Sequence, residues 1–150
     1  MEKQMAYDRM DWHYGASDFP SELDSKCAGT HIGMYLAWAI QNNLTGSIHT
    51  NESVEAIKNH KMSGTDFLIN QCDEKFWEDD LNELGQEFTK LYYKSNSYFS
   101  DYEKCLGDNY PSLYHIPDTR ENFEKVSKML TLKFNSWKSK KAKKCWEFWR

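Results

Sequence analysis

A chain of 150 residues, of which 39% are hydrophobic and 15% aromatic, can bury one sizeable core. This composition excludes a disordered chain and predicts a single domain over residues 1–150. The formal charge of −4 is unevenly spread, because residues 138–150 carry +5 and residues 1–137 therefore carry −9. An acidic body repels phosphate, which argues against nucleic-acid binding, and it suits a basic protein partner.

The cysteines and the first residues predict the compartment. Cys27, Cys72, Cys105 and Cys145 lie far apart and form no Cys-x-x-Cys pair, so a zinc site of the usual spacing is not expected. The chain begins Met-Glu-Lys-Gln-Met-Ala-Tyr-Asp, without the apolar stretch of a signal peptide. We therefore expect a cytoplasmic protein with free thiols.

Residues 1–28 mix aromatic residues with turn formers and predict an irregular aromatic leader. Such a segment is ordered only when its aromatic side chains are anchored. We therefore expect Trp12, Tyr14 and Phe19 to lie across the helix that follows.

Residues 30–43 predict the central helix of a mainly α fold with little or no sheet. Gly29 lets the chain turn in, and Thr30 can cap the helix. Apolar side chains occupy nearly all sides of this segment, which indicates burial on most faces. It is too short to cross a bilayer, which needs roughly 20 apolar residues. The core residues that we single out are Trp12, His31, Tyr35, Trp38 and Phe88.

Two short helices are expected next, the first capped by Thr50 or Asn51 and the second following a cap near Ser63. Apolar residues then step by three and four from Trp77 to Leu91, which predicts one long helix. Acidic residues stand at its expected start, where the helix dipole favours anions. A break at 95–97 separates it from a helix that ends at 107–109.

The last helix is predicted from an apolar stripe between Phe123 and Trp137. Asp118 to Glu121 resembles a capping box at its start, with aspartate as the cap. The basic, aromatic tail 138–150 either extends this helix or frays. No internal repeat or low-complexity tract divides the chain.

Cys27, His31 and His13 are the residues whose types and spacing could support chemistry. A cysteine nucleophile needs a lowered pKa and a positioned base, and a metal needs a compact ligand set. This set lacks a second tight pair of ligands, and a histidine at a helix N-terminus is favoured in its neutral form. We therefore expect a structural His31 and assign no catalytic residue, no metal and no cofactor.

Paired carboxylates occur at 73–74 and 78–80, but solvated helix faces carry such pairs far more often than active sites do. The sequence contains no calcium-loop, dinucleotide, phosphate-loop or nucleophile-elbow motif. We therefore expect a protein that is not an enzyme.

The leader and the central segment together resemble a little-characterised family of bacterial proteins. Its members carry an aromatic leader in which Trp-His-x-Gly precedes Phe-Pro, here within 12–20. A Thr-His-Ile-Gly-Met-Tyr-Leu-Ala-Trp helix follows, here 30–38. Weaker matches follow at 81–88, 92–93, 101–102 and 118–119. The resemblance covers roughly residues 5–137 and leaves the basic tail outside.

Members of this family are often encoded beside polymorphic-toxin and contact-dependent growth inhibition genes. The resemblance therefore implies an immunity protein, which would bind a cognate toxin domain, such as a basic nuclease, and cover its active site. It carries over no catalytic residue. Within this interpretation, the candidate toxin-binding residues are the acidic Glu78, Asp79, Asp80 and Glu83 and the aromatic Tyr98 and Trp146. No direct nucleic-acid or membrane contact is expected.

Two alternatives stay open. One is a small enzyme, with or without a metal, that uses Cys27, His31 and His13. The other is a general protein or RNA adaptor that uses the tail 138–150, in which a lysine run stands beside the aromatic Trp146, Phe148 and Trp149.

Overall fold

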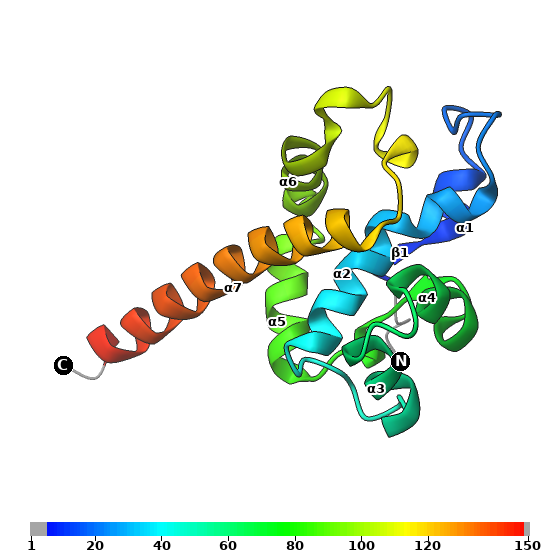
Figure 1. The fold of residues 1–150 in the computed structure, drawn as a ribbon. Coiled ribbons are helices and arrows are strands. Elements are labelled where there is room, and N and C mark those ends of the chain that lie inside the picture. Colours follow the sequence, from blue (N-terminus) through cyan, green and yellow to red (C-terminus); the bar gives the residue numbers. More distant parts are fainter. Residues whose placement is uncertain (1–5, 149–150) are drawn as a thin grey trace, which may run out of the picture.

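The computed structural model describes residues 6–148 (Figure 1). Within this range the fold is mainly α, as the sequence predicts. The α-helices are α1 (Met10–Tyr14), α2 (Thr30–Gln41), α3 (Asn51–Lys58), α4 (Gly64–Cys72), α5 (Glu83–Tyr92), α6 (Ser97–Leu106) and α7 (Arg120–Phe148). A small antiparallel sheet pairs β1 (Asp8–Arg9) with β2 (Lys75–Phe76). The 3₁₀ turns are η1 (Ser25–Gly29), η2 (Glu78–Asp80), η3 (Gly107–Asn109) and η4 (Leu113–His115).

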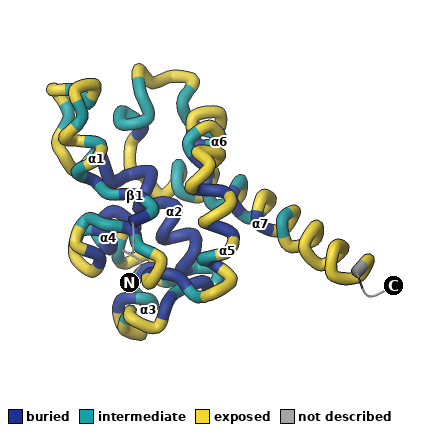
Figure 2. The backbone as a smooth tube through the Cα atoms, turned by 180° about the vertical axis from the view of Figure 1, so that it is seen from behind, coloured by how far each residue is buried: buried dark blue, intermediate teal, exposed yellow. Residues whose placement is uncertain are grey.

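Helix α2 is the centre of the fold, as its all-round apolar sequence predicts. Every residue from position 30 to 40 is buried, and α3, α4 and α7 contact it (Figures 1 and 2). The closest approach is to α4, where the two backbones touch at glycines. A Cβ atom on Gly33 would lie 2.4 Å from the backbone nitrogen of Thr65, and one on Gly64 would lie 1.8 Å from the carbonyl oxygen of Gly33.

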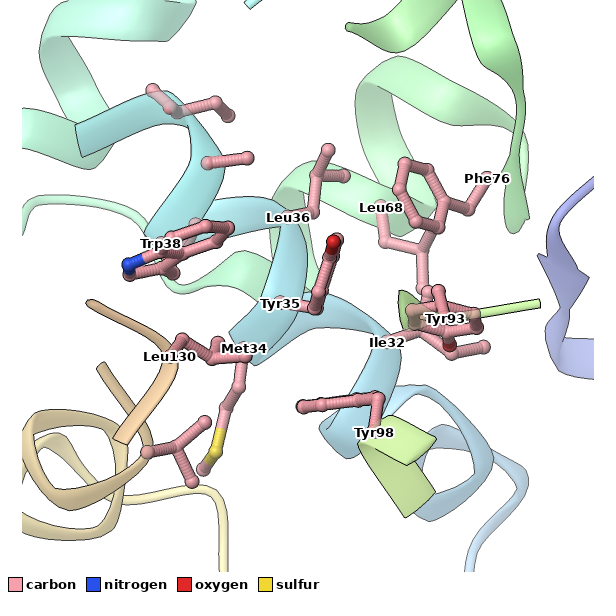
Figure 3. Packing of buried hydrophobic residues seen from close by; sticks show 14 of the residues in the cluster. Ile32, Met34, Tyr35, Leu36, Trp38, Leu68, Phe76, Tyr93, Tyr98 and Leu130 are labelled. Atoms are coloured by element: carbon pink, nitrogen blue, oxygen red, sulfur yellow. The ribbon is translucent and has the colours of Figure 1, made fainter. Parts of the chain in front are cut away.

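The core is built from large aromatic side chains around α2 (Figure 3). The predicted core residues His31, Tyr35, Trp38 and Phe88 are all buried. Two of these side chains have their polar ends paired, since the hydroxyl of Tyr35 lies 2.8 Å from Oγ1 of Thr89 and the indole of Trp38 donates to Thr131. Buried aromatic side chains therefore add area to the core without leaving these polar atoms unpaired.

The prediction for Trp12 is wrong, because 48% of this residue is exposed. The leader is also more regular than predicted, since β1 and α1 lie within it. The short helix α1 turns Met10 inward against Gly29, which places Trp12 on the outer face under the Arg9 guanidinium. Phe19 does anchor the leader, with its ring 4.9 Å from that of Tyr114.

The predicted long helix from residue 77 is also shorter than its apolar period indicates. Helix α5 begins only at residue 83, where the Asn82 side chain accepts a hydrogen bond from the backbone N–H of Gly85. Leu81 instead forms a β-bridge with Thr45. The acidic residues 78–80 therefore belong to a separate turn, η2, and not to the first turn of an α-helix.

Local capping follows the sequence at three of five helix starts or breaks. The predicted Thr30 cap of α2 is wrong, because Thr30 is the first residue of the helix and its N-cap, Gly29, has no side chain that could cap it. Thr50 caps α3 and Ser63 caps α4 through their side-chain oxygens. Asn96, in the left-handed region at φ 66°, separates α5 from α6. The predicted Asp118 cap of α7 is wrong: Oγ1 of Thr119 accepts the hydrogen bond from the N–H of Asn122, and Asp118 accepts one from Thr65.

Helix α7 begins on the core and then leaves it (Figures 1 and 2). Val126, Leu130 and Phe134 are buried, whereas residues 138–147 are all exposed. The tail thus extends the helix, one of the two predicted outcomes. Residues 149 and 150, included in that prediction, lie outside the described residues. None of the described helices combines the length and apolar character that crossing a membrane requires.

Candidate functional site

Two of the acidic residues proposed as partner contacts, Asp79 and Asp80, line a hollow in the molecular surface between the end of α4 and the turn η2. We call this site the acidic hollow. It measures about 470 Å³ and is lined by Ile48, Gln71, Cys72, Asp73, Trp77, Asp79 and Asp80. Residues 71–90 contain seven acidic and two basic residues, and the side chain of Ile48 at the rim is 62% exposed. The hollow therefore offers both negative charge and apolar surface.

Asp80 holds the floor of the acidic hollow in place. Its carboxylate accepts hydrogen bonds from the backbone N–H of Trp77 at 2.7 Å and from Cys72, and it lies 2.8 Å from Nε2 of His49. Burial, followed by the negative charge of Asp80, raises the pKa of the Cys72 thiol, which is therefore not a reactive thiolate. These contacts fix the turn that displays Asp79.

Four of the six predicted contact residues remain available on the surface. Glu78, Asp79, Glu83 and Trp146 are exposed. The prediction is wrong for Asp80, which is 3% exposed and used as an internal clamp. It is also wrong for Tyr98, which is fully buried and donates its hydroxyl hydrogen to the carbonyl oxygen of His31.

A second polar cluster lies where β1, α1 and α2 meet. Asp8 Oδ1 lies 2.7 Å from Nε2 of His13, and Asp8 Oδ2 lies 3.4 Å from Nε2 of His31. The rings of the two histidines meet edge to face at 4.6 Å. We call these three residues the Asp–His cluster. Two tyrosine hydroxyls complete it: that of Tyr93 donates to Asp8 at 2.5 Å, and that of Tyr114 lies 2.7 Å from Nδ1 of His13.

The surroundings shift the pKa values of Asp8 and His31. Burial alone would raise the pKa of Asp8, but its hydrogen bond with His13 and the closeness of the two imidazole rings outweigh burial and hold that pKa well below its usual range. Burial lowers the pKa of His31, and Asp8 only partly opposes this shift. The cluster therefore contains a buried carboxylate beside a neutral His31.

The predicted grouping of His13 with His31 is correct, but the third predicted residue, Cys27, is wrong. Among the described residues, the group that converges is Asp8 with the two histidines, and Cys27 lies outside it on η1. Burial and the nearby carboxylate of Asp24 raise the pKa of the Cys27 thiol, which is the opposite of what a nucleophile needs. The pairing of β1 with β2 places Asp8 in this cluster. Strands of two residues are too short to show an alternating pattern in the sequence, so the sequence does not indicate this pairing.

A further cavity lies between α2 and the start of α7, beside Met34, Ala37 and Phe123, and measures about 150 Å³. Pockets that bind small molecules are usually larger, at roughly 300–1,000 Å³. Its size does not favour a substrate site.

Comparison with known proteins identifies the chain by family alone. No curated protein and no solved structure matches it. A family model described as a domain of unknown function, DUF7832, matches residues 6–116, a range that contains α1 to α6, the acidic hollow and the Asp–His cluster. That range is nearly three quarters of the sequence, and the chain therefore belongs to this family.

Proposed function

We propose that this protein is a cytoplasmic immunity protein of a bacterial contact-dependent inhibition system. It binds one cognate toxin domain and neutralises it by covering the active site, without chemistry of its own. The observation that carries the proposal is the acidic hollow, in which exposed carboxylates surround accessible apolar surface. The family resemblance of the leader and the central helix points to the same class of protein.

The chemistry of the hollow fits a toxin that acts on nucleic acid. A nuclease binds phosphate in a basic groove, and the carboxylates of Glu78 and Asp79 would occupy the phosphate positions in that groove. Opposite charge also accelerates the encounter of the two proteins. Ile48 and Trp77 supply the apolar contact that charge alone does not, and tryptophan is frequent among the residues that dominate binding energy.

Rigidity supports this use of the surface. The turn that carries Glu78 and Asp79 is tied to the core by the buried carboxylate of Asp80. A surface that is already ordered loses little conformational entropy when it binds, so more of the contact energy appears as affinity.

The test is co-expression with the toxin domains encoded next to this protein's gene. We expect one neighbouring product to stop growth of a bacterial host, and this protein to restore growth and co-purify with it. The variant Glu78→Lys/Asp79→Lys should weaken the complex at least tenfold and abolish rescue, since two attractive charges become repulsive.

The matched control is Glu103→Lys/Asp108→Lys, which makes the same charge change at exposed positions on α6 and η3. This control should rescue growth as the wild type does. If no neighbouring product forms a complex and none is neutralised, the proposal fails. If both variants lose rescue equally, net charge and not the acidic hollow determines binding.

A further inference from the structure

The Asp–His cluster has the composition of a metal site. It supplies one carboxylate and two imidazoles, whose ligand atoms all lie within 4.8 Å of one another. Two histidines and one carboxylate are a recurring ligand set for zinc and other divalent transition metals. The three residues come from β1, α1 and α2, so the fold brings them together from separate elements.

His31 provides an independent observation that points to a ligand. Its side chain is fully buried, and neither ring nitrogen has a hydrogen-bond partner. The nearest acceptor, Oδ2 of Asp8, lies 3.4 Å from Nε2 and does not meet hydrogen-bond geometry. Buried polar atoms are nearly always paired, so an unpaired imidazole aimed at a carboxylate calls for a partner.

Tyrosine hydroxyls contact the other two ligands, His13 and Asp8. In metal sites, groups outside the coordination sphere orient the ligands in this way. The hydroxyl of Tyr114 contacts Nδ1 of His13, which leaves Nε2 directed at Asp8. The hydroxyl of Tyr93 donates to Asp8 Oδ2 and orients the carboxylate. Metal-binding histidines usually make such a contact through the nitrogen that does not bind the metal.

The distances and charges fit zinc. Ligands at about 2.0–2.1 Å from a tetrahedral zinc ion lie roughly 3.3 Å apart. Oδ2 of Asp8 lies 3.4 Å from Nε2 of His31, and Oδ1 of Asp8 lies 2.7 Å from Nε2 of His13. A carboxylate that binds through both oxygens therefore needs only the second separation to widen by about half an ångström. Zinc binds imidazole in its neutral form and carboxylate in its charged form.

We propose that Asp8, His13 and His31 form a binding site for a divalent transition-metal ion, with zinc as the best fit. This inference differs from the sequence prediction of no metal and is independent of the proposed function. The side chain of His13, 15% exposed, lies at the solvent edge and marks the path by which the ion enters. A water molecule would fill the fourth position.

The other convergent group, His49, Cys72 and Asp80, does not carry the same inference. None of its buried side-chain nitrogen or oxygen atoms lacks a hydrogen-bond partner, and Asp80 accepts hydrogen bonds from the backbone N–H of Trp77 and from Cys72 and contacts His49. The contacts within that group hold the turn η2 in place. The group therefore provides a matched control for the proposed metal site.

The test is zinc titration of chelator-stripped full-length protein in competition with a chromophoric chelator. We expect one equivalent of Zn²⁺ per chain and a higher unfolding temperature when zinc is present. His13→Gln should remove tight binding, and Tyr114→Phe should weaken it about 10–100-fold by releasing the outer contact. Co²⁺ in place of Zn²⁺ should give the visible absorption of a four-coordinate ion.

His49→Gln is the control and should bind zinc as the wild type does. His13 lies at the solvent edge, so its variant should remain folded by circular dichroism even if a His31 variant does not. The proposal is overturned if the wild type binds no stoichiometric zinc. It is equally overturned if folded His13→Gln binds with unchanged affinity, or if His49→Gln removes the ion.

Discussion

Replacing Gly33 by alanine should separate α2 from α4. A Cβ atom at this position would lie 2.4 Å from the nitrogen of Thr65 and 2.6 Å from the carbonyl carbon of Gly64. Both atoms belong to the backbone, so no rotamer change relieves the contact. The helices must move apart by about 1 Å to restore an ordinary contact distance of roughly 3.5 Å.

The size of the effect follows from two opposing quantities. Overpacking a well-packed core costs about 1–3 kcal/mol, and a backbone contact belongs at the upper end of that range. Alanine gains about 1 kcal/mol over glycine within a helix. The net loss should therefore be about 2 kcal/mol, which corresponds to a fall of about 4–8 °C in Tm for a chain of this size.

Urea unfolding followed by circular dichroism measures this loss, with the m-value as a check that the unfolded state is unchanged. The control is Gly107→Ala, whose Cβ would meet that of Glu103 at an ordinary 3.6 Å. We expect the control to lie within about 0.5 kcal/mol of the wild type. Helix propensity alone would make Gly33→Ala more stable than the wild type. If the variant is as stable as the wild type or more stable, α2 and α4 do not approach each other as closely as described.

Three further predictions concern the core, the acidic hollow and the tail. Tyr35→Phe removes the contact with Thr89 and should cost about 1 kcal/mol by urea unfolding. Burial raises the pKa of Tyr35, so above pH ~10 the unfolded state loses protons that the native state keeps, and stability falls. Tyr35→Phe should make that alkaline decline shallower by one proton, and an unchanged slope would contradict it. Asp80→Ala leaves buried donors unpaired and should cost about 3 kcal/mol by the same measurement, whereas a neutral result would remove its role as a clamp. Deleting 138–150 should change Tm little, because the ion pair of Lys141 with Glu87 on the body is exposed and worth about 0–1 kcal/mol.

Local chemistry was predictable where neighbouring residues decide the structure. Thr50 and Ser63 cap their helices because a side-chain oxygen two or three residues before an unpaired N–H suffices. The central helix was predictable for a similar reason, since apolar residues on every side leave burial as the stable outcome.

Long-range pairing was not predictable. Trp77 and Leu81 continue the apolar period of α5, but strand pairing at β2 and the bridge from Thr45 to Leu81 outcompete helix formation there. Asp8 reaches His13 and His31 from β1, which pairs with β2. Tyr98 is buried against the rings of Tyr35 and Tyr93, and its hydroxyl donates to the carbonyl oxygen of His31. Each of these features depends on contacts between residues that lie far apart in the sequence. No local sequence pattern indicates such contacts.

Helix α7 gives the molecule a rigid arm. Its first half is embedded through Val126, Leu130 and Phe134, and its second half continues into solvent without interruption. At 1.5 Å per residue, the exposed positions 138–147 make up about 15 Å of helix. Because the embedded half cannot turn without disturbing the core, any protein that grips the tip also dictates how the rest of the molecule is oriented.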